Sequence, residues 1–172
     1  MEIRLLSPSD AESYWKLRLQ ALKQNPEAFL TSYEDSVKRV NPVEQTARSF
    51  TNQGNYTFGA FDGEELIGTV TVLQDNRAKT RHRADIFAMY VTPKKQGVGI
   101  GKALMEAAIT KVKNIEEIEK INLTVTSSNE KAKRLYNKLG FKTFGLEEKA
   151  IKVDGVYFDE EYMVLHLNRQ GN

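Results

Sequence analysis

The feature that most constrains the fold is a change of hydrophobic period in the middle of the chain. From Tyr56 the apolar residues follow the two-residue period of β-strands, and after Thr92-Pro93 they recur with helical spacing. The glycine-rich stretch Gln96 to Gly101 lies between the two patterns. A strand, a tight turn and an amphipathic helix in this order predict a sheet with helices packed on its faces.

The N-terminal third predicts one short strand and two helices. Glu2 to Leu6 has a strand pattern, and Ser9 with Glu12 indicates a capping box that opens a helix ending at Asn25-Pro26. Asn41-Pro42 indicates the start of a second helix, which closes near Gly54. The residues expected on the buried faces of these helices are Trp15, Leu19 and Leu22 in the first and Val43, Ala47 and Phe50 in the second.

The remaining elements complete one sheet. Asp62-Gly63 predicts a hairpin turn between strands 56–61 and 66–73, and Ala84–Val91 reads as a central strand. A helix from Ile100, a strand over 121–125, a helix from Asn129 to Gly140 and a hairpin of strands 149–153 and 156–167 follow. We therefore expect a single domain, residues 1–172, of α/β (α+β) class: a mixed, mostly antiparallel central sheet flanked by helices.

The composition excludes several classes of protein. The 172 residues carry a formal net charge of only +2, spread along the chain, which argues against a nucleic-acid partner. There is no cysteine, so disulfide, cysteine–zinc and thiol-nucleophile chemistry are excluded, and two histidines argue against a metal site. The N-terminal residues lack a signal-peptide pattern, and no apolar stretch is long enough to span a bilayer. We expect a cytoplasmic protein with no membrane partner.

The glycine-rich turn predicts a phosphate site. Amide groups at a helix start are unpaired and carry partial positive charge, and glycines at 97, 99 and 101 let a phosphate approach them. A P-loop is excluded because Gln96 and Ala103 stand where glycine and Ser or Thr are required. A dinucleotide motif fails because Lys102 occupies the place of its third glycine. Coenzyme A remains.

Two motifs resemble those of the GNAT superfamily of N-acetyltransferases. Gln96-Gly97-Val98-Gly99-Ile100-Gly101 resembles the family's [R/Q]-x-x-G-x-[G/A] pyrophosphate loop, with glutamine where arginine is commoner. Asn129 to Phe141 resembles its N-x-x-A-x-x-L-Y-x-x-x-G-F helix, and Met89 to Pro93 resembles the splayed strand before the loop. The order of elements matches across nearly the whole chain. The resemblance implies a GNAT-like acyl-CoA N-acyltransferase fold.

The resemblance also implies how acetyl-CoA, the cosubstrate, is held. The loop from Gln96 to Lys102 is expected to bind its diphosphate through the backbone, with no metal. The backbones of Met89, Tyr90 and Val91 are expected to pair with the pantetheine like an added strand. Asn129 is expected to hydrogen-bond the pantetheine, and the same residue is equally suited to cap a helix.

Two side chains are candidates for the chemistry. Tyr136 matches the family tyrosine that protonates the leaving thiolate, although a core tyrosine would show the same helical spacing. Asp85 matches a strand carboxylate that serves as base in some relatives, and burial there would raise its pKa. The alternatives for Asp85 are an ion pair with Arg83 or Arg81, and an ordered water as the base.

The resemblance implies transfer of acetyl from acetyl-CoA to a primary amine by direct attack in a ternary complex. A small-molecule amine is the favoured acceptor; a protein N-terminus or lysine, and a non-catalytic acyl-CoA-binding module, are the alternatives. Acidic residues that could attract the amine are Glu34 and Asp35 and the run Asp159-Glu160-Glu161, although solvated carboxylates explain them too. The sequence leaves a homodimer open.

Overall fold

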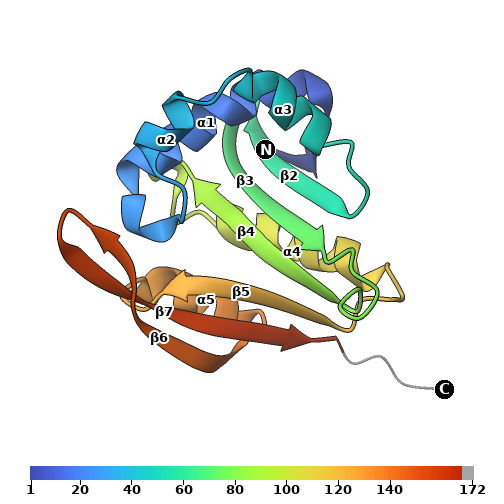
Figure 1. Ribbon diagram of the computed structural model, residues 1–172. Helices are drawn as coiled ribbons and strands as arrows, with labels where there is room; N and C mark the ends of the chain where they lie inside the picture. The colour runs from blue at the N-terminus through green and yellow to red at the C-terminus, as the bar shows by residue number, and fades with distance from the viewer. Residues whose placement is uncertain (168–172) are drawn as a thin grey trace.

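The hairpin turn at Asp62-Gly63 joins two neighbouring strands of the sheet, and Gly63 has the positive φ that such a tight turn requires. The computed structural model, described here for residues 1–167, has seven strands in the order β1-β2-β3-β4-β5-β7-β6 (Figure 1). The strands are Glu2–Leu5 (β1), Asn55–Asp62 (β2), Glu65–Gln74 (β3), Arg83–Val91 (β4), Lys120–Thr126 (β5), Lys142–Val153 (β6) and Val156–His166 (β7).

Helices cover both faces of this sheet (Figure 1). They are Ala11–Gln24 (α1), Tyr33–Val37 (α2), Pro42–Ser49 (α3), Ile100–Lys113 (α4) and Glu130–Lys138 (α5), with 3₁₀ turns at Pro8–Asp10 (η1), Pro26–Ala28 (η2) and Pro93–Lys95 (η3). The buried stripe of α4, which includes Leu104 and Met105, packs with strand residues such as Val70 in the larger core. On the other face Leu17 and Ala21 of α1 form a smaller core with Tyr90. The predicted mixed sheet flanked by helices is confirmed.

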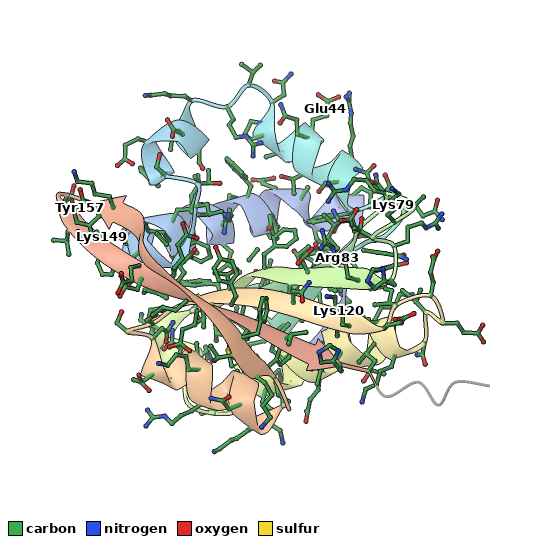
Figure 2. All side chains as sticks on the ribbon, turned by 60° about the horizontal axis from the view of Figure 1, so that its bottom comes forward. Glu44, Lys79, Arg83, Lys120, Lys149 and Tyr157 are labelled. Carbon is green, nitrogen blue, oxygen red and sulfur yellow. The ribbon has the colours of Figure 1, made fainter. Side chains whose placement is uncertain are left out.

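One pair of strands, β4 and β5, is parallel, and it opens part-way along. The two strands pair only from Arg83↔Lys120 to Ile86↔Leu123 and then diverge (Figure 1). All other neighbouring strands are antiparallel. Figure 2 shows Arg83 beside Lys120 at the closed end, while Lys149 and Tyr157 lie at the far tip of the β6–β7 hairpin.

A bulge in β4 accompanies the divergence. Ala88 has φ 52°, in the left-handed region, and the register of β4 against β3 shifts between Thr69 and Thr71. The Thr69 hydroxyl donates to the Ala88 carbonyl at 3.3 Å. A bulge bends its strand and increases the local twist. The end of β4 is thereby turned away from β5.

Several local expectations were wrong. The first helix is not capped by Ser9 and Glu12: the Asp10 carboxylate accepts from the Ser7 amide at 2.8 Å, and α1 begins after η1. In α1, Leu22 is buried as predicted, whereas Trp15 and Leu19 are only partly buried and Leu17 and Ala21 are buried in their place. The buried residue of α3 is Thr46, while Val43 is exposed. The short helix α2 was not predicted, and β6 begins at Lys142 rather than at Lys149.

Candidate active site

Two adjoining cavities lie where β4 and β5 separate. The first, of about 740 Å³, lies between the glycine turn and α5, and we call it the α5 cavity. The second, of about 850 Å³, lies over β4, β5 and β7, and we call it the β7 cavity. The residues that line both are Ala28, Phe29, Met89, Thr126, Asn129, Ala132 and Tyr136. The two cavities therefore adjoin along these seven residues, and we call the place where they meet the passage.

Six consecutive amides are bare at the mouth of the α5 cavity. Among residues 1–167, no acceptor receives a hydrogen bond from any N–H between Gly97 and Lys102, and the first amide of α4 to be paired is that of Ala103, which donates to the Gly99 carbonyl at 3.0 Å. Buried or not, unpaired amides at a helix start are an anion site because the helix dipole adds positive potential there. The expected phosphate cradle has the required donors.

Gly97 and Gly99 shape this turn. Their φ angles are 83° and 89°, which residues with a side chain rarely adopt. A Cβ at either position would meet no heavy atom within 4 Å, so the space beside the turn is open to a ligand. Gly101 differs, because its Cβ would lie 3.0 Å from the Met89 Cε. Only the first two glycines are needed for the turn itself; the third permits contact between α4 and β4.

The remaining loop residues divide between the cavity and the core. Gln96, Gly97, Gly99, Gly101 and Lys102 line the α5 cavity. The side chain of Val98 is 73% exposed and that of Ile100 is buried in the core, so neither lines the cavity. For Val98 and Ile100, only the backbone amide remains a candidate ligand.

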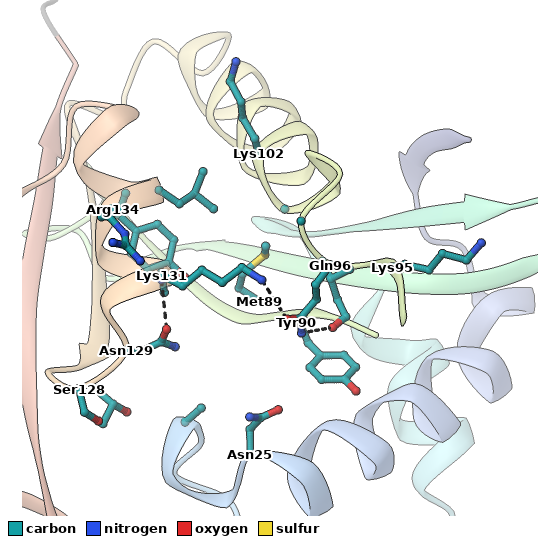
Figure 3. Close-up of a pocket in the computed structure, with 18 of the residues that line it drawn as sticks. Asn25, Met89, Tyr90, Lys95, Gln96, Lys102, Ser128, Asn129, Lys131 and Arg134 are labelled. Carbon is teal, nitrogen blue, oxygen red and sulfur yellow. Dashed lines mark hydrogen bonds between the residues drawn. The ribbon is translucent and has the colours of Figure 1, made fainter. Parts of the chain in front are cut away.

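The side chain of Gln96 has a structural role beside the backbone contact predicted for this residue. Its Nε2 donates to the Val91 carbonyl at 2.9 Å, and its Oε1 accepts from Lys131 Nζ at 3.1 Å. Figure 3 shows Lys131 reaching across from α5 to this glutamine. Gln96 therefore ties the end of β4 to α5 over the cavity. An arginine at position 96 could make only one of these two contacts: it could donate to the Val91 carbonyl, but it has no acceptor for Lys131.

Basic side chains surround the mouth of the α5 cavity. Lys95, Lys102, Lys131, Arg134 and Lys138 all line it. Lys95 is paired with Asp62 at 2.5 Å, and Lys102 with Glu106 at 3.5 Å. Both ion pairs are exposed to solvent and therefore contribute little free energy, so a ligand phosphate can replace the carboxylates. The potential at the mouth is positive, as a diphosphate requires.

Asn129 has the capping role that the sequence allowed. Its Oδ1 accepts from the Ala132 amide at 3.1 Å at the start of α5. The side chain is exposed and lines both cavities, so its amide NH₂ is still available to a ligand. Nearby, the Thr126 hydroxyl donates to the Glu27 carbonyl at 2.9 Å and holds η2 over the passage.

The three strand residues point in different directions. All three line the α5 cavity and Met89 also lines the β7 cavity, while the Tyr90 side chain packs toward α1 and its hydroxyl donates to Gln24 Oε1 at 2.5 Å. Val91 belongs to the α4 core. Beyond Ile86 no strand formed by residues 1–167 pairs with β4 on its β5 side. The free backbone there suits an extended ligand, as predicted, although the Val91 carbonyl already accepts from Gln96.

Tyr136 stands between the two cavities. Its side chain is buried on α5, 6.1 Å from the Phe141 ring, and desolvation raises its pKa to about 12. In the described part of the chain no group forms a hydrogen bond with its hydroxyl. The hydroxyl is not one of the fully enclosed polar atoms that lack a partner, so it is open to the cavities that the residue lines, as donation of a proton to a ligand requires.

Asp85 lies in the β7 cavity, but its predicted burial was wrong. The residue is exposed, on the face of β4 opposite the buried Ala84 and Ile86. The predicted ion pairs are absent within residues 1–167: Arg83 pairs with Asp75 at 3.2 Å, and Arg81 with Glu117 at 3.0 Å. Asp85 is therefore a solvated carboxylate that faces the same cavity as Tyr136.

Sequence reasoning missed most of the β7 cavity. Arg18, Phe144, Glu147 and Tyr162 line it, and no motif marks them. Of the acidic run in β7, only Glu160 lines the cavity, and burial raises its pKa. Asp159 accepts from the Lys149 amide and Glu161 pairs with Lys133, so these two are structural. The two-residue alternation of side chains along β7 could have shown that Glu160 points to the opposite face from Asp159 and Glu161. Glu34 and Asp35 of α2 line neither cavity.

Comparison with known proteins decides the family. The model of the Acetyltransferase (GNAT) family matches residues 15–141, which include both motifs and the divergent strands. This chain belongs to the GNAT acetyltransferase family. The L-amino acid N-acetyltransferase AaaT of Escherichia coli is 32% identical over 102 residues, which cover 59% of this chain and 62% of the relative. The chain thus aligns with less than two thirds of that relative's length.

Solved structures share the fold across the whole chain. An acetyltransferase of the GNAT family from Streptococcus pneumoniae has a TM-score of 0.87 at 23% identity, covering 96% of this chain and 99% of its own. The protein yncA from Salmonella typhimurium, solved with its cofactor acetyl-CoA, has a TM-score of 0.85 at 19% identity and covers 100% of this chain and 96% of its own. At these identities the likeness is one of fold.

No set of three His, Cys, Asp or Glu side chains within residues 1–167 is arranged to hold a metal ion. In the same range every helix is too short or too polar to cross a membrane.

Proposed function

We propose that this chain is an N-acetyltransferase that moves the acetyl group of acetyl-CoA to the primary amine of a small molecule. The observation that carries the proposal is the run of six unpaired amides from Gly97 to Lys102 at the mouth of a cavity with a positive rim. Family membership and the E. coli relative named for amino acids support both the donor and a small acceptor.

Acetyl-CoA supplies an activated thioester. In the proposed complex its diphosphate is bound by the amides of Gly97 to Lys102. Met89 and the other free backbone groups of β4 hold the pantetheine together with the Asn129 amide. The thioester then lies in the passage shared by the two cavities, and the amine enters from the β7 cavity as the third member of a ternary complex.

Proton transfer requires one donor and one acceptor. The nitrogen of the amine bonds to the acetyl carbon, the carbon–sulfur bond breaks, one proton leaves nitrogen and one reaches sulfur. Tyr136 is proposed to supply the proton to sulfur, because it lines both cavities, its hydroxyl has no hydrogen-bond partner among the described residues, and burial keeps the phenol protonated at neutral pH. Asp85 is proposed to take the proton from nitrogen through a water, since it is exposed within the β7 cavity.

The proposal is tested by thiol release from acetyl-CoA across a panel of amines, amino acids and peptides. Small amines are expected to release thiol in proportion to acetylated product, whereas peptides are expected to be poor acceptors. Release with peptides alone would move the function to protein acetylation. Binding of acetyl-CoA with no release for any acceptor would leave a non-catalytic module.

A further inference from the structure

Arg18 is placed as a cation at the wall of the β7 cavity. It lies on α1, its guanidinium sits 4.6 Å from the centre of the Phe29 ring, and the residue is only partly exposed. Phe29 lines both cavities, so the stacked guanidinium is next to the passage that holds Tyr136. Burial lowers the pKa of Arg18, the nearby Tyr14 offsets part of this effect, and the nearby Arg39 adds to it.

No carboxylate neutralises this guanidinium. Within the described residues Arg18 forms no ion pair, whereas the arginines that do pair with a carboxylate are Arg4, Arg48, Arg77, Arg81 and Arg83. The other described arginines without such a partner, Arg39 and Arg134, are exposed to water. A partly desolvated charge without a counter-ion is unfavourable unless a ligand supplies one.

The rest of the β7 cavity carries the opposite charge. Asp85, Glu147 and Glu160 line it, and Glu147 accepts from the Tyr162 hydroxyl. Arg83, the other cation in the wall, is already paired with Asp75. The cavity thus has a single uncompensated cation on the α1 side and carboxylates on the strands. A ligand that matches this pattern has an anionic and a cationic group.

We propose that the acceptor amine also carries a carboxylate. Arg18 binds this carboxylate, and Glu160 attracts the ammonium end of the same molecule. The inference rests on the proposed acetyltransferase function. A guanidinium can hold a carboxylate through two parallel hydrogen bonds. Stacking on Phe29 fixes the plane of the guanidinium before the ligand arrives, which lowers the cost of ordering it. Arg18 is then the residue that determines specificity between amino acids and simple amines.

The test uses acceptors that differ only in the anionic group. Amino acids, their amides with the same side chain, and polyamines are assayed for thiol release with the wild-type protein and with Arg18→Gln. Wild type is expected to prefer each acid over its amide. In Arg18→Gln, kcat/KM for the acids is expected to fall at least about 30-fold, mainly through KM, because a charge-paired contact is lost. The amides are expected to change less than about 3-fold.

Two further variants test whether the geometry of Arg18, and not only a positive charge nearby, determines the preference for acids. Arg18→Lys keeps the charge but not the two-pronged geometry, and we expect an intermediate KM for the acids. Arg39→Gln removes the neighbouring exposed charge and is expected to leave the ratio of acid to amide unchanged. Melting temperature and calorimetric affinity for acetyl-CoA are measured for each variant, and both are expected to match wild type.

The outcomes separate the two proposals. Equal kcat/KM for acids and amides in wild type, or equal loss for both in Arg18→Gln, overturns the carboxylate assignment while acetyl transfer stands. Thiol release from no acceptor, despite acetyl-CoA binding, overturns the proposed function and the inference with it. A variant with lower acetyl-CoA affinity would assign Arg18 to the donor side and contradict the inference.

Discussion

Tyr136→Phe is the sharpest test of the chemistry, because it removes one oxygen and nothing else. The hydroxyl has no hydrogen-bond partner in the described structure, and the ring packs beside Phe141. The variant therefore loses no intramolecular hydrogen bond, and its free energy of unfolding at neutral pH is expected to stay within about 1 kcal/mol of wild type. The affinity for acetyl-CoA is also expected to be unchanged, since the diphosphate is bound at the other end of the cavity.

The expected loss is in turnover. A positioned general acid contributes about 100- to 10,000-fold, so kcat is expected to fall at least about 100-fold, which corresponds to about 2.7 kcal/mol in the barrier. Steady-state thiol release at saturating acetyl-CoA measures this effect. Tyr14→Phe is the matched control, because Tyr14 is a second phenol whose pKa is raised by burial and which lines neither cavity. Its kcat is expected to equal that of wild type.

The raised pKa gives the same variant a second readout. A folded-state pKa of about 12, above the usual value near 10, means that ionisation of Tyr136 opposes the folded state. The stability that the neutral phenol provides is complete below pH 10 and is lost as the pH rises toward 12, by about 2.7 kcal/mol. Tyr136→Phe is expected to lose correspondingly less stability over that range in urea titrations. Turnover equal to wild type, with chemistry rate-limiting, would remove Tyr136 from the mechanism.

Two further predictions address the loop and the acceptor side. Gly99→Ala and Gly63→Ala both place a Cβ at positive φ in open space, and each is expected to lower the free energy of unfolding by about 1–2 kcal/mol. Only Gly99→Ala is expected to weaken acetyl-CoA binding, by at least about 10-fold in calorimetry. Asp85→Asn is expected to lower kcat at least about 10-fold, whereas Glu160→Gln is expected mainly to raise the acceptor KM. The reverse pattern would transfer the role of base to Glu160, and equal affinities of the two glycine variants would contradict the phosphate cradle.

Local signals in the sequence predicted the fold well where turn chemistry determines it. Asp62-Gly63 and Asp154-Gly155 each join paired strands, and the glycine turn leads into α4 as expected. The start of α1 was wrong because the 3₁₀ turn η1 precedes it, and η1 is held by contacts of Asp10 with Arg4 and Ser7 that the sequence pattern does not reveal. Of the predicted buried residues of α1, Leu22 is buried and Trp15 and Leu19 are only partly so. Residues near Lys142 read as a loop because the first half of β6 is largely exposed.

The site was only half predictable for a physical reason. The α5 cavity is built from consecutive backbone groups, so a glycine pattern marks it. The β7 cavity is built from single side chains on α1, β4, β5, β6 and β7, and Ala88, whose φ is positive, lies in its wall. A non-glycine residue with positive φ leaves no signature in sequence, and neither does an unpaired Arg18. The acceptor side therefore required the structure.

The central claim is that the bare amides from Gly97 to Lys102 bind the diphosphate of coenzyme A. Backbone ¹⁵N–¹H NMR during titration with coenzyme A reports on each of these amides directly. The account predicts that the largest shifts fall on these six amides, while those of the β2–β3 hairpin at Gly63 stay unchanged. Binding of coenzyme A that leaves the six amides unmoved would contradict it.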